Sequence, residues 1–190
     1  MDISKTYKAL YEKVVSEHTE VFEKQDIPEM EAFMQEIINA DRVFLMGVGR
    51  EGIATRGFAM RLMHLGKESH WIWDDTTPNM REGDLFIATN GCGEIGHIHY
   101  VVEQAQIAGA KVAVVTGSPG GKTAKIADLV LFVPACVYNG TDPRAVDSIL
   151  PMGSLFEEHL FMLFDLLIIM MAEEMKVEKH EMSARHRNIE

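Results

Sequence analysis

Three glycines, Gly47, Gly49 and Gly52, form the part of the sequence whose spacing most clearly suggests chemistry. They follow residues 42–46, a mostly apolar run that predicts a buried strand, and precede apolar residues at helical spacing that continue to Leu65. Glycine lets a turn bring its backbone close to a ligand, and the free N–H groups that begin a helix attract anions. The stretch therefore predicts a strand, a glycine turn and a helix, with an anion site at Gly47 and Gly49.

The same glycine spacing is compatible with three interpretations. It matches the dinucleotide-binding fingerprint, and Asp74 and Asp75 lie near the distance at which that fingerprint places its ribose-binding acid. A purely structural turn would also use small residues where a strand meets a helix. The third interpretation, which we favour, is a site for a small molecule that carries a phosphate group.

A second glycine loop follows a strand predicted at residues 84–89. It consists of Asn90, Gly91, Cys92, Gly93 and Glu94, directly before a predicted helix. The pKa of a thiol tends to fall at the start of a helix, so Cys92 is either a nucleophile or simply a small loop residue, and we favour the small residue.

Histidines and cysteines give no pattern typical of a metal site. His97 and His99 lie two residues apart on a predicted helix and therefore point to different sides. Cys92 and Cys136 provide neither a zinc-ligand spacing nor a disulfide framework. We expect no metal ion.

Strands and helices alternate along the middle of the chain. Strands are predicted at residues 42–46, 69–73, 84–89, 111–115 and 129–133, and helices at 3–24, 28–40, from the first turn to 65, 95–108, 123–127 and 154–176. Nearly continuous apolar strands that alternate with helices indicate a parallel sheet covered on both faces. We expect an α/β fold, a doubly wound five-stranded parallel sheet flanked by helices with a flavodoxin-like strand order. Ligands bind at the carboxyl ends of such strands, where the glycine loops fall.

The composition limits the classes of protein to consider. The chain has 190 residues, 47% of them hydrophobic and 25% charged, which predicts one globular domain with a substantial core. A formal net charge of −11 opposes non-specific binding to nucleic acid. Residues 1–10 lack a signal-peptide pattern, and the apolar run at residues 160–172 is too short to span a bilayer. We expect a cytoplasmic protein that binds neither nucleic acid nor membrane.

The helix predicted at residues 154–176 is rich in methionine and apolar on nearly every face around residues 161–171. A helix of this kind is buried on all sides, which in a chain of this size requires a covering partner, most simply another copy. We divide the single domain, residues 1–190, into a helical arm at 1–40, an α/β core at 41–135, the long buried helix at 151–176 and a polar tail at 177–190.

Several motifs together relate the chain to a known family. They are Gly47-x-Gly49-Arg50, residues 58–66 (FAMRLMHLG), Thr76-Thr77-Pro78, residues 82–85 (EGDL), residues 151–157 (PMGSLFE) and Arg185-His186-x-Asn188-x-Glu190. With these motifs the chain resembles the sugar isomerase (SIS) domain family, and more narrowly the bacterial and archaeal 6-phospho-3-hexuloisomerases. The resemblance covers most of the chain. It implies a five-stranded SIS-type sheet, a homotetramer, and interconversion of 3-hexulose 6-phosphate and fructose 6-phosphate through an enediol, without metal or organic cofactor.

The resemblance also implies a site for the phosphorylated sugar. It assigns substrate or phosphate contacts to Gly47, Gly49, Arg50, Thr76, Asn90, Gly91, Cys92, Gly93 and Glu94. Arg50 could instead form a surface ion pair, and Thr76 could merely turn the chain. The family's loops usually read G-x-G-R-S-G and S-G-S-G-E-T, whereas this chain has Glu51, Asn90, Cys92 and Ile95 at hydroxyl positions. Two lost hydrogen bonds to phosphate amount to roughly 3–6 kcal/mol, so these departures predict a weaker or altered phosphate pocket.

Isomerisation by this route needs a base for a carbon-bound proton and an acid that relays protons between oxygens. The resemblance assigns the base to Glu157 and makes His64 and His186 candidates for the relay. Each has a structural alternative. Ser154-x-x-Glu157 has the spacing of a capping box, His64 could be a core or interface residue, and His186 could belong to a solvated tail. The altered loops leave two other functions open, a non-catalytic sugar-phosphate-binding module and a SIS isomerase for a different phosphosugar.

Overall fold

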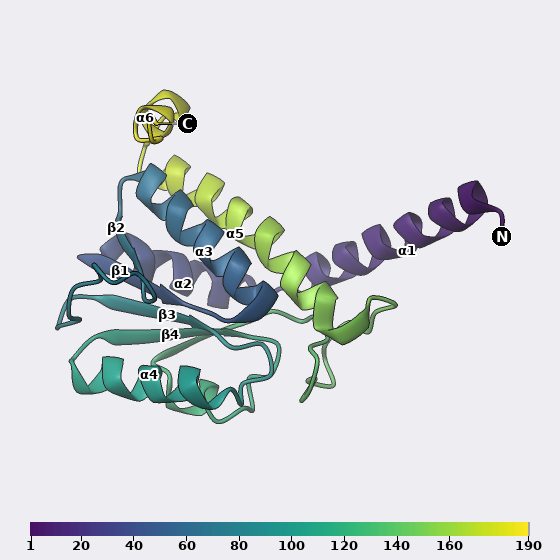
Figure 1. Ribbon diagram of the computed structural model, residues 1–190, viewed down its shortest axis with the longest axis horizontal. Helices are drawn as coiled ribbons and strands as arrows, with labels where there is room; N and C mark the ends of the chain where they lie inside the picture. The colour runs from purple at the N-terminus through teal and green to yellow at the C-terminus, as the bar shows by residue number, and fades with distance from the viewer. Residues whose placement is uncertain (190) are drawn as a thin grey trace.

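The computed structural model describes residues 1–189 and contains one five-stranded sheet with the order β2-β1-β3-β4-β5 (Figure 1). The strands are β1 (Arg42–Met46), β2 (Glu68–Trp71), β3 (Leu85–Thr89), β4 (Lys111–Thr116) and β5 (Leu129–Phe132). All neighbouring strands are parallel, with Phe44 opposite Phe86 and Phe86 opposite Val112 in the central register. The predicted α/β fold and its flavodoxin-like strand order are confirmed.

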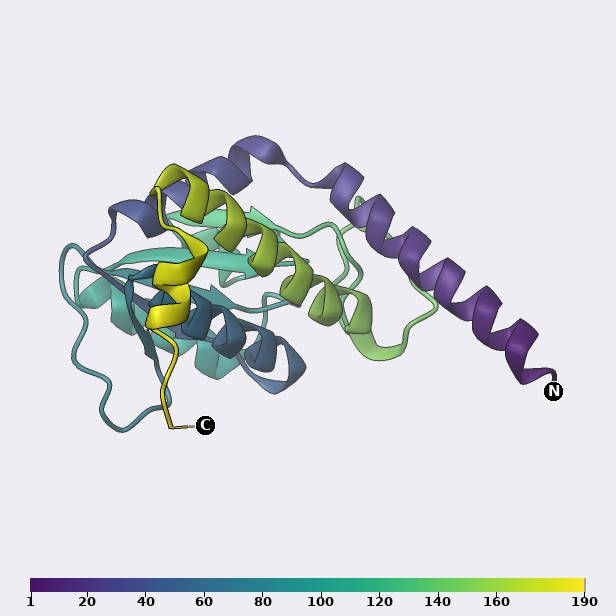
Figure 2. The same ribbon diagram turned by 90° about the horizontal axis from the view of Figure 1, so that it is seen from above.

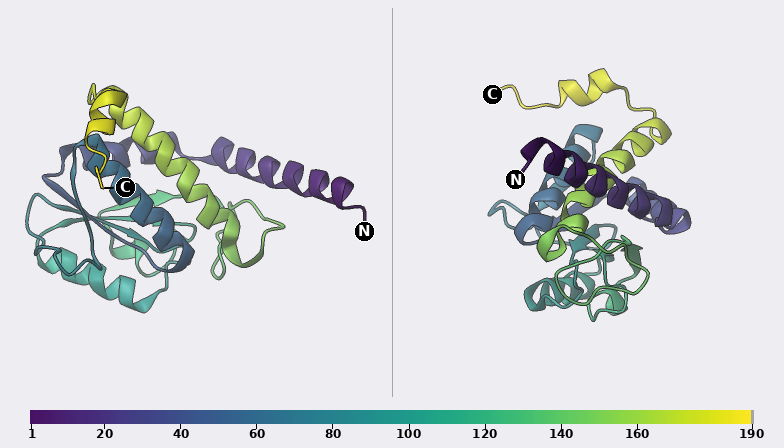
Figure 3. Two further views of the ribbon diagram at one scale, coloured as in Figure 1. Left: turned by 45° about the horizontal axis from the view of Figure 1, so that its top comes forward. Right: turned by 90° about the vertical axis from the view of Figure 1, so that its right-hand side faces the viewer.

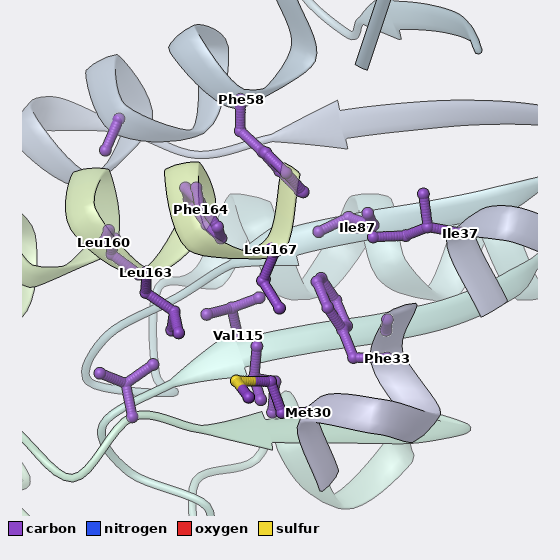
Figure 4. Packing of buried hydrophobic residues seen from close by; sticks show 14 of the residues in the cluster. Met30, Phe33, Ile37, Phe58, Ile87, Val115, Leu160, Leu163, Phe164 and Leu167 are labelled. Carbon is purple, nitrogen blue, oxygen red and sulfur yellow. The ribbon is translucent and has the colours of Figure 1, made fainter. Parts of the chain in front are cut away.

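Alternate residues of the central strands point to opposite faces of the sheet and build two apolar cores. On one face, Leu45, Ile87 and Val115 pack beneath three helices, as Figure 4 shows in part. These helices are α2 (Ile27–Asn39), α3 (Gly49–Leu65) and α5 (Ser154–Glu174). On the other face, Phe44 and Phe86 pack against α4 (Gly96–Ile107) and near the 3-10 turn η1 (Ala124–Ile126). The sheet is therefore covered on both faces, which leaves its edges for ligands.

The long helix α5 is buried on one side only within a single chain. It lies beside α3, where the rings of Phe58 and Phe164 stack with centroids 4.3 Å apart (Figures 1 and 4). Its opposite side exposes the large apolar residues Phe161, Met162, Leu166, Ile169 and Met170. Helix α5 is thus not covered on all sides by its own chain, and a second copy that covers it stays a prediction.

The first helix, α1 (Ile3–Lys24), projects away from the body of the molecule (Figures 2 and 3). The predicted apolar stripe is present on it, but only Glu17 and Val21 are buried, whereas Ile3 and Tyr7 are 72% and 68% exposed. An apolar stripe that its own chain leaves uncovered is suited to contact with another surface. Neither α1 nor any other helix among residues 1–189 combines the length and the apolar character that crossing a bilayer requires.

Three short segments differ from the sequence-based expectations. The polar tail contains a short helix, α6 (Lys179–Ala184), which begins with a capping box between Glu178 and Glu181. The helix expected at residues 123–127 is only the 3-10 turn η1, and a second 3-10 turn, η2 (Pro151–Gly153), precedes α5. Strand β2 ends at Trp71, because the chain turns there and the Thr77 hydroxyl donates to the Trp71 carbonyl.

Candidate active site

The first glycine turn joins β1 to α3 at the carboxyl edge of the sheet. A Cβ atom on Gly47 would lie 2.9 Å from the Gly52 Cα atom, so the strand and the helix meet without room for side chains. Gly49 has a φ of +57°, the left-handed conformation that favours glycine. Close packing and backbone conformation therefore explain these glycines. They also place the first turn of α3 at the end of β1, and the N–H groups of that turn lack acceptors within the helix.

The second glycine loop is held by the side chain of Asn90. Asn90 is completely buried, its Nδ2 donates to Thr123 Oγ1 at 3.0 Å, and its Oδ1 accepts from the Ile95 N–H at 3.4 Å. Cys92 also points to this amide, with Sγ 3.8 Å from Asn90 Oδ1. The loop packs on the next one, because a Cβ atom on Gly93 would lie 2.9 Å from the Gly121 Cα atom. The Asn90 amide is thus engaged within the protein, whereas Glu94 lies at the rim, where it accepts from the Lys122 N–H.

Glu51 links the two glycine loops. It lies in the first turn of α3, is 8% exposed, and its Oε2 accepts the Gly91 N–H at 2.9 Å. Its Oε1 is shielded from solvent and has no hydrogen-bond partner among the described residues. Burial raises the pKa of Glu51 to about 8, the Gly91 hydrogen bond opposes that shift, and the charge of Glu157 adds to it. The carboxyl group is therefore a neutral acid at pH 7.

Glu157 lies in the first turn of α5, beside the start of α3. Its Oε2 is 3.3 Å from Arg50 Nε, and Arg50 also donates to Glu158 Oε1 at 3.1 Å and to Ser154 Oγ at 3.0 Å. Burial raises the pKa of the Glu157 carboxyl, Arg50 lowers it, and Glu158 raises it further. Arg50 therefore does form an ion pair, and its partners include the candidate base.

The capping box considered for Ser154 and Glu157 is not formed. Gly153 occupies the cap position of α5 without a side-chain hydrogen bond, and the Ser154 hydroxyl donates to the Pro151 carbonyl at 2.7 Å. The Glu157 carboxylate is therefore not used to close the helix start, and it stays available for chemistry at the edge of the sheet.

Two histidines, His18 and His159, lie close to Glu158. His18 Nε2 is 3.8 Å from Glu158 Oε2, and the Nδ1 atoms of His18 and His159 are 3.2 Å apart. Burial lowers the pKa of His159 to about 3, with a smaller contribution from His18, and burial also lowers the pKa of His18 against the opposing effect of Glu158. Both rings are therefore neutral at pH 7 and form a polar connection from α1 to the start of α5.

His64 and His186 come together at the opposite end of α3. Their rings stack with centroids 5.2 Å apart, and Arg185 donates to the His64 carbonyl at 3.0 Å, which ties the tail to the end of α3. They line a cavity of about 590 Å³ that also includes Trp71 and Asp74. His64 lies 13 positions after Glu51 along α3, and Glu51 is close enough to the predicted base Glu157 to feel its charge. At 1.5 Å per residue, 13 positions span roughly 20 Å. Within one chain the predicted relay residues therefore do not meet the predicted base.

The remaining predicted site residue, Thr76, is exposed in the turn after β2. His99, which was not expected to bind a metal, has its Nδ1 atom 3.4 Å from Thr123 Oγ1. In residues 1–189, no three His, Cys, Asp or Glu side chains are placed so that one metal ion could bind them together.

Comparison with known proteins identifies the family. Residues 36–157 match the SIS domain. The chain belongs to the SIS domain family. Among SIS relatives, 3-hexulose-6-phosphate isomerase from Mycobacterium gastri is 35% identical over 88% of this chain and 83% of its own length. The Bacillus subtilis 3-hexulose-6-phosphate isomerase is 32% identical over 85% of this chain and 87% of its own length.

A solved SIS structure supports the same relationship. The Methanococcus jannaschii protein, whose crystal structure infers a molecular function of 3-hexulose-6-phosphate isomerase, has a TM-score of 0.82 and 28% identity. The match covers 95% of this chain and 98% of that protein. The predicted resemblance to the hexuloisomerase branch of the SIS family is confirmed.

The fold brings Glu51, Glu158 and His18 to this edge of the SIS domain, and sequence reasoning gave only Glu51 a place there, as a departure from the family's loop. For Glu51, the available signal was a charged residue at a position where the family usually has serine. For His18 no signal existed, because its contact with His159 joins residues 141 positions apart.

Proposed function

We propose that the protein is a sugar-phosphate isomerase of the hexuloisomerase type, which interconverts 3-hexulose 6-phosphate and fructose 6-phosphate. The observation that carries this proposal is the Glu157 carboxylate, which is free of any capping role and lies beside Arg50 at the carboxyl edge of a SIS sheet. Relatives that carry the name 3-hexulose-6-phosphate isomerase, at 32–35% identity over most of the chain, support it.

In this mechanism Glu157 removes the proton from C2 of 3-hexulose 6-phosphate while an acid protonates the oxygen on C3, which gives an enediol. The proton on O2 then leaves, and the carbon-bound proton returns to C3, so that fructose 6-phosphate forms without net gain or loss of protons. Partial burial raises the pKa of Glu157, which makes it a stronger base, and Arg50 favours its ionised form. No step requires an electron acceptor or a bound cofactor.

The phosphate group is placed in this proposal at the two glycine loops. Gly47, Gly49 and Arg50 border it on one side and residues 90–94 on the other, while Thr76 stays a candidate contact for the sugar. The N-terminal ends of α3 and α4 face the same edge, where helix dipoles favour an anion.

Within a single chain, neither candidate for the proton relay lies near Glu157. His64 and His186 lie at the far end of α3, so the proposal takes the relay residue from a second copy of the chain. We extend the proposal to a cytoplasmic homo-oligomer, most simply a tetramer. The exposed apolar residues along α1 and α5 support such an assembly, because they give each copy uncovered surface to bury.

A turnover assay tests the proposal directly. Purified protein is incubated with 3-hexulose 6-phosphate, and fructose 6-phosphate is measured over time. Glu157→Gln is expected to lower kcat by about 10²–10⁴-fold, the usual contribution of a positioned general base, with a small effect on substrate affinity. Glu158→Gln is the matched control, because it removes a neighbouring carboxylate that also pairs with Arg50, and its effect is expected to stay far smaller. Turnover that is absent, or unchanged in Glu157→Gln, contradicts the proposal.

A second candidate, a non-catalytic sugar-phosphate-binding module, is favoured by the state of the loop side chains. Asn90 and Glu51 both make hydrogen bonds within the protein instead of leaving hydroxyl-like donors free. Thermal-shift measurements with fructose 6-phosphate separate the two candidates, because a ligand that binds only the folded state raises the melting temperature. Stabilisation without turnover supports the binding module.

A further inference from the structure

Glu17 is buried, although most of α1 is exposed. Its Oε2 atom accepts from the Ser148 hydroxyl at 2.6 Å, and its Oε1 atom accepts from the Ile149 N–H at 3.2 Å. The Ser148 oxygen in turn accepts from the Leu150 N–H at 2.9 Å. One carboxyl group on α1 therefore holds three consecutive residues of a segment that lies far along the chain.

The segment that Glu17 holds leads directly into the turn η2 and the start of α5. Within η2, Met152 has a φ of +58° and Gly153 a φ of +78°. Residues other than glycine rarely adopt this left-handed conformation, and it persists only where the surrounding structure holds the backbone. The Met152 side chain is 71% exposed, so it does not provide that hold. Contacts on either side of η2 do: Glu17 before it and, after it, Gly153, where a Cβ atom would lie 2.5 Å from the Tyr138 backbone nitrogen.

The same segment sets the surroundings of the candidate base. Ser154 follows η2, and its hydroxyl donates to the Pro151 carbonyl at 2.7 Å and accepts from Arg50 Nη1 at 3.0 Å. The Nε atom of Arg50 lies 3.3 Å from Glu157 Oε2. A continuous set of contacts therefore runs from Glu17, through η2, to the ion pair of Arg50 and Glu157.

The end of α1 is also packed against α5 itself. His18, the residue after Glu17, has its Nδ1 atom 3.2 Å from His159 Nδ1. Phe22, one turn further along α1, has its ring centroid 4.2 Å from that of His159. Because these contacts fix the last turns of α1 against α5, Glu17 is a firm anchor for the segment before α5.

We propose that Glu17 is a positioning residue of the isomerase, which places Glu157 for proton abstraction by holding residues 148–150 at the entrance to α5. Glu17 acts through the backbone of that segment and not by contact with the substrate, and this inference rests on the proposed function. A misplacement of about 1 Å at a reacting group lowers turnover by up to about 10²-fold. Release of the segment is therefore expected to lower kcat, with little change in KM, because the glycine loops provide the phosphate contacts in the proposed function.

Steady-state kinetics with 3-hexulose 6-phosphate test this role. Glu17→Ala removes both hydrogen bonds and is expected to lower kcat by about 10- to 100-fold, with KM nearly unchanged. Glu17→Gln keeps an oxygen that accepts from the Ile149 N–H, so it is expected to lose less. Glu20→Gln is the matched control, because it removes an exposed carboxylate of α1 that pairs only along the helix, with Lys24, and it is expected to keep the wild-type kcat.

Combination with Glu157→Gln separates positioning from a loss of folded protein. Because Glu17 acts through Glu157, Glu17→Ala is expected to lower the residual kcat of Glu157→Gln much less than it lowers the kcat of the wild type. A variant that is merely less folded loses the same factor in both backgrounds. Amide hydrogen exchange adds a measurement that needs no substrate, since the N–H groups of Ile149 and Leu150 are expected to exchange faster in Glu17→Ala than in the wild type or Glu20→Gln.

Three results overturn the inference: Glu17→Ala keeps the wild-type kcat, its effect is undiminished in Glu157→Gln, or exchange at Ile149 and Leu150 is unchanged. If circular dichroism shows that Glu17→Ala does not fold, Ser148→Ala, which removes only the hydroxyl, replaces it with the same expectations at a smaller size. If the wild type turns over 3-hexulose 6-phosphate and any of these results is found, the proposed function stands and only the role of Glu17 is lost. If the wild type shows no turnover, the proposed function fails and the inference with it.

Discussion

Two buried carboxyl groups at opposite edges of the sheet differ in how many hydrogen bonds and how much positive charge offset their burial. Asp84, just before β3, accepts from Arg42 Nε at 2.8 Å, from Arg42 Nη2 at 2.6 Å and from the Arg81 N–H at 2.8 Å. Glu51, at the carboxyl edge, accepts one hydrogen bond and keeps one oxygen without a partner among the described residues.

This difference shows how the surroundings decide whether a buried carboxyl group is ionised. At the amino edge a guanidinium and an amide surround the charge, so Asp84 and Arg42 join the starts of β1 and β3. At the carboxyl edge no cation pairs with Glu51 among residues 1–189, so the group keeps its proton and an unfilled hydrogen-bonding position.

The largest expected effect comes from breaking the compensated pair. Asp84→Ala leaves the Arg42 guanidinium partly buried without its carboxylate, and we expect the free energy of unfolding to fall by about 3–5 kcal/mol. Urea denaturation measures the change. Asp84→Asn, which keeps an acceptor of the same shape, is expected to lose less. A loss below about 1 kcal/mol in Asp84→Ala would show that the pair contributes little.

The second prediction concerns the uncompensated group and the effect of pH on stability. The folded pKa of Glu51, about 8, lies above its usual 4.5, so the folded state holds the proton that the unfolded state releases. The stabilisation from this proton is complete below about pH 4.5 and is lost as the pH rises towards 8, with a slope of at most about 1.4 kcal/mol per pH unit.

Chemical denaturation of the wild type and Glu51→Gln between pH 5 and pH 8.5 measures that slope. The difference between the two curves isolates Glu51, because all other titrating groups are shared. We expect the wild type to lose stability relative to Glu51→Gln as the pH rises. A difference that is flat, or that increases in favour of the wild type, argues against a protonated Glu51.

The smallest expected effect on stability is at Arg50, whose side chain is more than half exposed. Arg50→Met removes ion pairs with Glu157 and Glu158, and exposed pairs of this kind contribute up to about 1 kcal/mol. Because Arg50 lowers the pKa of Glu157, its loss is expected to move the acidic limb of the pH profile of kcat to higher pH. Arg50→Lys, which keeps the charge, should shift the limb less. A shift of the limb to lower pH would show that Arg50 does not lower the pKa of Glu157.

Local patterns were sufficient to predict the sheet. Apolar runs such as residues 42–46, alternating with helical spacings, lead to a parallel doubly wound arrangement, and the glycine turn after β1 is where it was expected. Residues 178–181 show a limit of such patterns, because the capping box of α6 has glutamate at both ends instead of serine or threonine at its start.

Contacts between distant residues could not be predicted in this way. Ser154 and Glu157 have the spacing of a capping box, but Arg50, more than a hundred positions earlier, pairs with Glu157 and donates to the Ser154 hydroxyl. The position of the Glu51 carboxyl against Gly91 joins residues 40 positions apart. Likewise, the spacing of apolar residues identifies the stripe on α1 but does not reveal that the chain leaves it uncovered.

The length of α3 has a consequence for stoichiometry. This helix separates the histidine end of each copy from its glutamate end by a rigid spacer. If two copies pair about a twofold axis, the contact that brings the histidines of the first to the glutamate of the second also does the reverse. In such a dimer complete active sites form in pairs, and a single chain has none. Turnover per chain should therefore fall on dilution in proportion to the fraction of dimer that dissociates.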